Sequence, residues 1–360
     1  MPTLPAPAAL QIALRRGRVR VLGEDRPDLA FYADPGVVEV DEDGSDLRLT
    51  CRGPRHIDLL VRVPTKLQTV EVEMAQGQVE IRGLTAEMNV EVANGSFRGE
   101  KLGGELQLEA GRADVVVDGM RGALQIDTGL GSVEVLRQRG PYALDTGGGS
   151  VHLADVEGEG EVQSGAGGIV LFQVAGRIEV ESGLGSIDVQ NPRDLSLAIT
   201  SAMGPVQIAG GRLARLEASM ERGSLRVAQS LIQSGEAELE VGNAHLQLDG
   251  RQGGRLEAFA HHGRVVSALP RVRLPFAGAP TPGERVVLTF DDGPEMLSVK
   301  TRRGSITVLR GRHDDTPLAS LQERERSRRL VLEELRAGRI TPGSARRLLA
   351  ALDRGTPGDG

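Results

Sequence analysis

The chain has 360 residues, a formal net charge of −7, 48 glycines, 2% aromatic residues and one cysteine. The glycines follow no Gly-x-y period and 26% of the residues are charged, which excludes collagen and low-complexity classes. A mildly negative chain lacks the basic surface of a general nucleic-acid binder, so we expect no nucleic-acid partner. The single Cys51 excludes an intramolecular disulfide and is expected to be a small buried residue of a strand.

The N-terminal part is predicted to be a tail followed by a cap. Residues 1–9 are expected to form a disordered tail. Residues 10–63 are expected to form a β cap, because short β-favouring runs alternate there with turn signals. Met1–Leu14 has no basic n-region, and no stretch approaches the ~18 apolar residues of a membrane span. We therefore expect a cytoplasmic protein with no signal peptide and no transmembrane segment, leaving peripheral envelope association and non-standard export open.

A repeat organises residues 64–310. Its clearest copies begin at Gly131, Gly149, Gly167 and Gly185, 18 residues apart, and continue with alternating runs such as Gly185-Ser-Ile-Asp-Val189. The same position recurs with steps of 16 to 21 residues at Gly77, Gly95, Gly111, Gly204, Gly223, Gly242 and Gly263, and after 41 residues at Gly304. We interpret the gap before Gly304 as two repeats with an insertion.

This period predicts the fold class: an all-β, parallel β-helix-like solenoid with about 18–19 residues and two short strands per repeat. Neighbouring repeats must stack, because one unit cannot bury its apolar face alone. The scarcity of aromatic residues favours a narrow core of Val, Ile and Leu into which bulky rings do not fit. An antiparallel β-roll with the same period is the structural alternative.

The last part of the chain favours helices. Residues 316–354 are predicted to form a C-terminal helical hairpin, in which Gly338 suits a C-cap and Thr341-Pro342 suits the start of the second helix. That helix carries one apolar stripe, made of Ala345, Leu348, Leu349 and Leu352. Residues 310–354 hold 11 Arg against 7 Asp and Glu, a charge of +4 that leaves −11 for the rest. Residues 355–360 are expected to be a second disordered tail.

Two resemblances follow from these patterns. The run Ile57-Asp-Leu-Leu-Val-Arg-Val-Pro64, with the repeats after it to about residue 310, resembles a bacterial family of β-strand-repeat domains of unknown function. That family is described as putative adhesins and is similar to the head GIN domain of proposed adhesins. Gly338-Arg-Ile-Thr341 and Leu348-Leu349 resemble the two-helix module called SHOCT-like, although Arg346 and Arg347 depart from its usual acidic residues. The first resemblance implies a β-solenoid-like fold and no established activity.

No residue set in the sequence amounts to a catalytic, cofactor-binding or metal site. Leu288-Thr-Phe-Asp-Asp-Gly-Pro294 is similar to the first motif of polysaccharide deacetylases, but that chemistry also needs two histidines four residues apart. The adjacent His261 and His262 are expected on opposite faces of a strand. We interpret Asp291 and Asp292 as turn residues. No two histidines of the sequence are four residues apart. The histidines are His56, His152, His245, His261, His262 and His313.

Two further ligand classes are disfavoured. Gly165-Ala-Gly-Gly168 lacks the Gly-Lys-Ser/Thr of a phosphate loop. Asp127, Asp145 and Asp188 are placed at different offsets within the repeats, so we expect no calcium ladder. The hydroxyl residues beside the corners are interpreted as hydrogen-bonding turn residues stacked in layers: Thr128, Ser132, Thr146, Ser150, Ser164, Ser182 and Ser186.

These observations favour a non-enzymatic scaffold that binds a protein or an envelope polymer along a repeated face. The helical tail would mediate docking or self-association, and no cofactor is expected. The first alternative is a regulatory protein of envelope-stress signalling that acts through residues 316–360. The second is a polysaccharide-active enzyme that uses Asp291 and Asp292.

Overall fold

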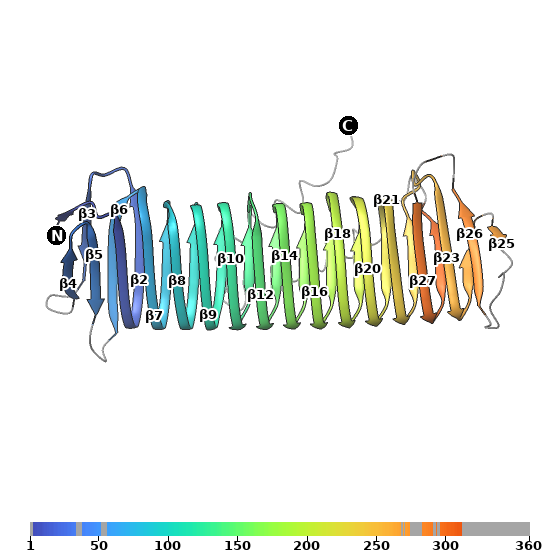
Figure 1. Ribbon diagram of the computed structural model, residues 1–360, viewed down its shortest axis with the longest axis horizontal. Coiled ribbons are helices and arrows are strands. Elements are labelled where there is room, and N and C mark those ends of the chain that lie inside the picture. The colour runs from blue at the N-terminus through green and yellow to red at the C-terminus, as the bar shows by residue number, and fades with distance from the viewer. Residues whose placement is uncertain are drawn as a thin grey trace, which may run out of the picture. The chain divides into compact units, whose positions relative to one another are not determined.

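The computed structural model describes residues 3–33, 38–51, 56–267, 269, 271–273, 283–290, 293 and 296–311. The chain divides into two compact units, Met1–Arg310 and Gly311–Gly360. Nearly all described residues belong to the first unit, in which strands follow one another side by side along one axis (Figure 1). The core of this unit consequently runs the length of the stack.

All described strands are joined in one hydrogen-bonded network. In chain order they are β1 (Thr3–Pro5), β2 (Ala9–Glu24), β3 (Asp28–Tyr32), β4 (Val38–Asp43), β5 (Asp46–Cys51), β6 (Ile57–Pro64), β7 (Lys66–Arg82), β8 (Thr85–Glu100), β9 (Gly103–Asp118), β10 (Arg121–Leu130), β11 (Val133–Leu136), β12 (Tyr142–Gly148), β13 (Val151–Ala154), β14 (Glu157–Ala166), β15 (Ile169–Phe172), β16 (Ala175–Leu184), β17 (Ile187–Gln190), β18 (Arg193–Met203), β19 (Val206–Ala209), β20 (Arg212–Arg222), β21 (Leu225–Val241), β22 (Ala244–Leu248), β23 (Arg255–His262), β24 (Val265–Ser267), β25 (Arg271–Arg273), β26 (Glu284–Thr289), β27 (Met296–Arg303) and β28 (Ile306–Arg310).

Two parallel ladders form the middle of the stack. The long-strand ladder consists of β10, β12, β14, β16, β18 and β20, and the short-strand ladder of β11, β13, β15, β17 and β19. Residues one repeat apart are direct neighbours, as the pairs Leu124↔Tyr142 and Val133↔Val151 show. This mostly parallel, all-β arrangement is consistent with a β-solenoid, and an antiparallel β-roll does not describe these strands.

The complete fold class predicted from the sequence, a solenoid with a C-terminal helical hairpin, was wrong. The described residues form strands and contain no helix. Residues 316–354, to which the hairpin was assigned, lie outside the described residues. The helix prediction depended on capping signals and one apolar stripe. Short helices gain most of their stability from tertiary packing, which a local pattern does not supply.

The prediction of two strands per repeat holds in the middle of the stack and fails before it. The strands from β10 to β19 alternate between long and short, whereas β7, β8 and β9 each continue through the corner as one strand of 17, 16 and 16 residues. Pairing is kept across that corner, where Gly77 lies directly opposite Gly95. Glycine has no Cβ, so the backbone can bend there without losing its partner.

Inward-facing residues of both ladders stack into an apolar core. Val133 and Val135 on β11, and Leu124 and Ile126 on β10, are at most 2% exposed, while the residues between them face outward. Full burial of such a side chain contributes about 1.5–3 kcal/mol. Every turn of the stack, here called a rung, buries side chains at these positions. Cys51 on β5 is buried as predicted, and burial raises the pKa of its thiol to about 11.

Aromatic rings do lie in this core, contrary to the prediction that rings do not fit. Phe97 is 1% exposed and Tyr142 is 5% exposed. Tyr142 lies opposite Gly160 on the next strand, where a Cβ would come within 2.0 Å of the tyrosine ring. The missing side chain of Gly160 therefore provides the volume that the ring fills. Burial also raises the pKa of the Tyr142 hydroxyl.

Both ends of the stack depart from chain order. β2 pairs in parallel with β5 and β6 on one side and with β7 on the other, so it forms a rung between two later segments. At the far end, β27 lies between β21 and β23 (Figure 1). Gly304 accordingly stacks between Gly242 and Gly263, and the interpretation of the preceding gap as two consecutive repeats was wrong. The antiparallel pairings occur beyond these rungs, at β1, β3, β4, β25 and β26.

Candidate functional site

The histidines and aspartates that suggested a deacetylase motif are not brought together by the described residues. Asp291, Asp292 and His313 lie outside the described residues. The rings of His261 and His262 have centroids 4.5 Å apart, so the prediction of opposite faces was wrong. These two residues end β23 at a corner, where the regular alternation of a flat strand no longer holds.

Acidic side chains form a continuous row on the outer face of the long-strand ladder and the strands before it. Asp127 lies opposite Asp145, so the prediction of different offsets was wrong for this pair, while Asp188 lies on β17 of the other ladder. The row consists of Glu73, Glu91, Glu109, Asp127 and Asp145. All five are exposed, and successive members are about 4.8 Å apart. Within the described ranges, no three or more His, Cys, Asp or Glu residues could hold a metal ion together.

The hydroxyl residues separate into two rows with opposite surroundings. Ser132, Ser150 and Ser186 are exposed, and the Ser132 hydroxyl and backbone N–H both donate to Asp114 Oδ1, at 2.7 and 2.9 Å. These two hydrogen bonds lower the pKa of the Asp114 carboxyl. The second row is at most 4% exposed and lies inside the core, at Thr128, Thr146, Ser164, Ser182 and Ser201. Among the described atoms, the hydroxyl oxygens of Thr146, Ser164, Ser182 and Ser201 have no hydrogen-bond partner.

One corner of the stack carries a glycine on almost every rung. In spatial order this corner row is Gly17, Gly77, Gly95, Ala113, Gly131, Gly149, Gly167, Gly185, Gly204, Gly223, Gly242, Gly304 and Gly263. A Cβ added to Gly95, whose φ is 142°, would come within 1.7 Å of the Gly77 carbonyl oxygen. Gly111, assigned to this row from the sequence, instead stacks against Gly129, and Ala113 takes its place.

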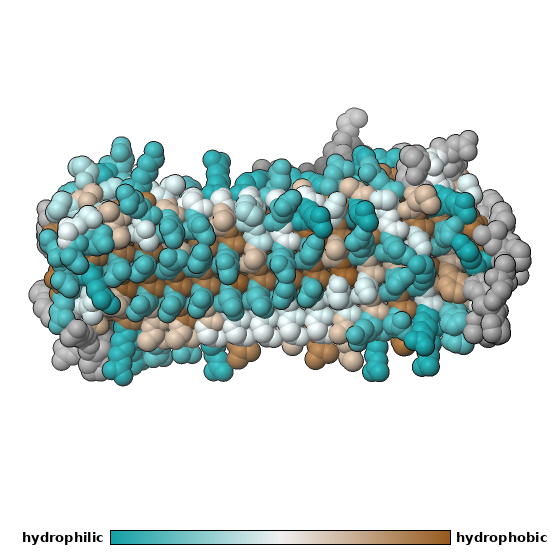
Figure 2. All heavy atoms as spheres, viewed as in Figure 1, coloured by the Kyte–Doolittle hydropathy of each residue, from teal (hydrophilic) through white to brown (hydrophobic). Residues whose placement is uncertain are grey.

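Two rows of side chains flank the corner row. The ridge row precedes each corner residue and comprises Arg16, Gln76, Asn94, Arg112, Leu130, Gly148, Ala166, Leu184, Met203, Arg222, Val241, Arg303 and His262. The serine row follows each corner residue and includes Arg18, Gln78, Ser96, Asp114, Ser132, Ser150 and Ser186. Hydrophilic side chains in parallel rows cover much of the visible face, with apolar residues between them (Figure 2).

The middle of the ridge row is apolar and exposed. Leu130, Leu184, Met203 and Val241 are between 43% and 54% exposed, which is unusual for large apolar side chains in this core-rich stack. Each projects next to a corner glycine that has no side chain to cover it. We call the corner row together with its two flanking rows the strip. Because the strip has apolar groups on one flank and hydroxyls on the other, it can contact both faces of an amphipathic ligand.

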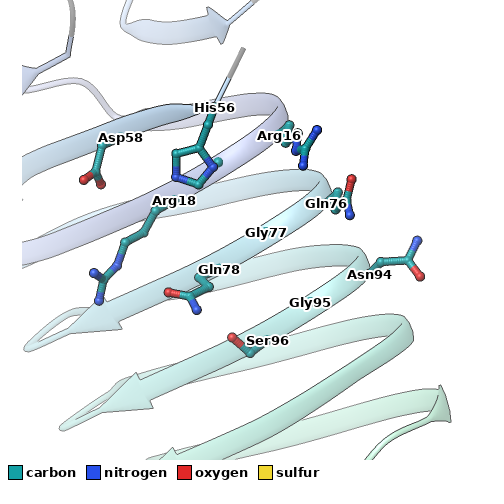
Figure 3. A pocket seen from close by; sticks show the side chains of 11 residues that line it. Arg16, Arg18, His56, Asp58, Gln76, Gly77, Gln78, Asn94, Gly95 and Ser96 are labelled. Carbon is teal, nitrogen blue, oxygen red and sulfur yellow. The ribbon is translucent and has the colours of Figure 1, made fainter. Parts of the chain in front are cut away.

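A hollow of about 620 Å³ lies over the corner row near β2 (Figure 3). Its floor is the backbone of Gly17, Gly77 and Gly95. The ridge-row side chains on one side are Arg16, Gln76 and Asn94, and the serine-row side chains on the other are Arg18, Gln78 and Ser96. His56 and Asp58, both exposed, complete the lining from the neighbouring segment of β6. We call these residues the arginine–amide hollow.

The arginine–amide hollow has an excess of positive charge. Arg18 Nη2 lies 3.3 Å from Glu80 Oε2, and Asp58 Oδ1 lies 3.8 Å from Arg20 Nη2, so both carboxylates already have a cationic neighbour. Arg16 is exposed and makes no ion pair within the described part of the chain, and its neighbour Arg15 likewise makes none there. The local charge therefore contrasts with the negative charge of the whole chain.

A second hollow, of about 580 Å³, lies on the outer face of the long-strand ladder. It forms where Ala198 and Gly235 are small, between Glu217 and Glu236. Each of its carboxylates already has a cationic partner, because Arg215 pairs with Glu217, and Lys300 pairs with Glu236 and with Glu238 at 2.9 Å. The arginine–amide hollow is the better candidate site, since it offers donors that no neighbouring side chain uses.

The sequence reasoning missed these residues, although it contained a signal for them. The tripeptides Arg16-Gly-Arg18, Gln76-Gly-Gln78 and Asn94-Gly-Ser96 all have a polar residue on each side of the corner glycine. The prediction assigned residues 10–63, which include Gly17, to a separate cap. It therefore did not align the first tripeptide with the other two.

Comparisons with known proteins give little information about function. The chain matches no family model and no curated protein. A solved structure described as a "putative cell adhesion protein" from Clostridium sporogenes is similar over 85% of this chain and 94% of that chain, at 9% identity and a TM-score of 0.20. Such a likeness carries no argument about the family or the function of this chain. The SHOCT-like resemblance has no support, because no described residue is helical.

The compartment stays a prediction. No helix among the described residues is long and apolar enough to cross a membrane.

Proposed function

We propose that this chain is a non-enzymatic binding scaffold of the adhesin type, which engages an extended partner along the corner row and its two flanking rows. One observation carries the proposal: the same three positions recur in register on successive rungs about 4.8 Å apart. An extended ligand can therefore contact an equivalent set of groups on each successive rung. Many weak contacts of this kind add up to appreciable avidity when they act together.

The chemistry of the rows favours a polymer of the cell envelope as the partner. The ridge row offers apolar contact in its middle, and the serine row offers hydroxyl donors and acceptors beside it. Polysaccharides have apolar C–H faces and polar hydroxyl edges, so one strand could use both flanks of the strip. As part of the same proposal, the chain reaches this polymer through the non-standard export left open above; a protein found in the cytoplasm alone on fractionation of source cells would contradict this.

The test is co-sedimentation of the purified full-length chain with envelopes isolated from the source cell. The altered variant carries Leu130→Ser, Leu184→Ser and Met203→Ser, which remove the apolar part of the ridge row. The control variant carries Val116→Ser and Val170→Ser on the outer face of the short-strand side, away from the strip. We expect saturable binding that the first variant loses and the control keeps. Equal binding by all three proteins, or none by the parent, would refute the proposal.

A further inference from the structure

The arginine–amide hollow brings together hydrogen-bonding groups from four strands. β2 contributes Arg16 and Arg18, β7 contributes Gln76 and Gln78, and β8 contributes Asn94 and Ser96. Asp58 lies within β6, and His56 directly precedes that strand. Figure 3 shows the ridge-row and serine-row side chains on either side of the glycine backbone. A volume of about 620 Å³ lies within the range of small-ligand sites, about 300–1,000 Å³.

The floor of the hollow depends on the absence of side chains. A Cβ on Gly77 would come within 1.8 Å of the Gly17 carbonyl oxygen, so no larger residue fits this backbone. The flanking side chains therefore stand above a flat floor. A ligand can rest on the backbone and reach donors on both sides.

We propose that the arginine–amide hollow binds an acidic oligosaccharide, with sugar carboxylates held by Arg16 on one flank and by Arg18 on the other. This inference rests on the proposed function and names the ligand class at one end of the strip. A guanidinium donates two parallel hydrogen bonds to a carboxylate, which gives both strength and orientation. Arg16 is the stronger candidate because no carboxylate of the described residues pairs with it.

The remaining lining suits sugar hydroxyls. The amides of Gln76, Gln78 and Asn94 each offer donors and an acceptor, as the hydroxyl of Ser96 does. Asp58 adds an acceptor for a hydroxyl donor. Apart from the imidazole of His56, the hollow has no aromatic ring on which a sugar could stack, so recognition depends mainly on charge and hydrogen bonds. The affinity should therefore fall as the salt concentration rises.

The surroundings disfavour a dense polyanion. The acidic row begins at Glu73 and Glu91, on the same β7 and β8 that line the hollow, and Glu80 lies next to Arg18. A nucleic acid laid across the hollow would bring phosphates toward these carboxylates, at a cost in repulsion. A sugar chain with separated carboxylates and neutral hydroxyls avoids this conflict.

The experiment is calorimetric titration of the full-length chain with tetragalacturonate, and with a neutral galactose tetramer as the reference ligand. The test variant carries Arg16→Gln and Arg18→Gln. The matched control carries Arg112→Gln and Arg222→Gln, which lie in the ridge row outside the hollow. We expect tetragalacturonate to bind the parent and the control equally. Binding to the test variant should be at least about tenfold weaker, since the variant loses charge-assisted hydrogen bonds.

Three results would overturn the inference: no binding of tetragalacturonate to the parent, equal weakening in the control, or equally tight binding of a single-stranded DNA oligonucleotide of matched charge. Because Arg18 also contacts Glu80, the single variants Arg16→Gln and Gln76→Ala are measured as well. At least Arg16→Gln should weaken binding at unchanged thermal stability. If the hollow variants keep envelope binding while the Leu130, Leu184 and Met203 variant loses it, the scaffold proposal stands and this inference fails.

Discussion

Substitution of Gly167 by alanine tests the close packing of the corner row. The φ angle of Gly167 is 148°, which L-residues rarely adopt, and its Cβ would come within 1.9 Å of the Gly149 carbonyl oxygen. The backbone must therefore shift by more than an ångström or so to restore an ordinary contact. That shift disturbs the hydrogen bonds from Gly167 N–H to Leu184 O and from Val151 N–H to Gly168 O, both 2.9 Å.

The expected cost follows from these contacts. A residue held in such a conformation is strained by about 1–3 kcal/mol, and each weakened backbone hydrogen bond costs about 1 kcal/mol. Together these terms predict a local destabilisation of about 3–5 kcal/mol. The neighbouring change Gly168→Ser is the control. Its Cβ would meet only Ser186, at ordinary contact distances of 3.5 Å to the hydroxyl oxygen and 3.9 Å to the carbonyl oxygen, and other rungs carry serine at this position.

Hydrogen exchange of individual amides is the suitable assay, because a stack of repeats need not unfold in one step. The amides of Val151 and Ile169 should exchange about 100-fold to 4,000-fold faster in Gly167→Ala, since each 1.4 kcal/mol corresponds to tenfold. Gly168→Ser should leave their exchange unchanged or slightly slower. If Gly167→Ala leaves these rates within about twofold of the parent, the steric argument for the corner row is wrong.

Three further predictions follow. Thr146→Val should raise the midpoint of thermal unfolding, because its buried hydroxyl has no partner among the described atoms; a lower midpoint would show that the hydroxyl is bonded. Glu109→Gln should stabilise the fold by about 0.2–1 kcal/mol at low salt, since like charges lie opposite it on both sides, and this gain should disappear in 1 M salt. Asp114→Asn should destabilise the protein at pH 7. The folded-state pKa of Asp114 is lowered from 3.8, so the parent's higher free energy of unfolding in urea titrations should be fully present above pH 3.8 and vanish as the pH falls through the lower folded-state pKa. A stability difference that does not depend on pH would contradict the role of the Ser132 hydrogen bonds.

The candidate site shows how far local reasoning reached. Alternation around Gly131 and Gly149 predicted which residues face the core, and the spacing predicted which residues stack. The same spacing, applied to Asp127 and Asp145, should have placed them opposite each other. The arginine–amide hollow was missed, because Gly17 precedes Gly77 by 60 residues in the sequence and lies next to it in the structure.

The repeat period could be recognised in the sequence because parallel stacking requires the same turn residues at the same offsets in each repeat. That requirement determined the β class, the stacked apolar core and the glycine corners. The order of rungs at the two ends was decided only by the tertiary structure. β2 and β27 each fill a position between segments that are distant in the chain. The period specifies the conformation of a single rung. Which segments pair with that rung depends on the strand edges and apolar faces that would otherwise stay exposed.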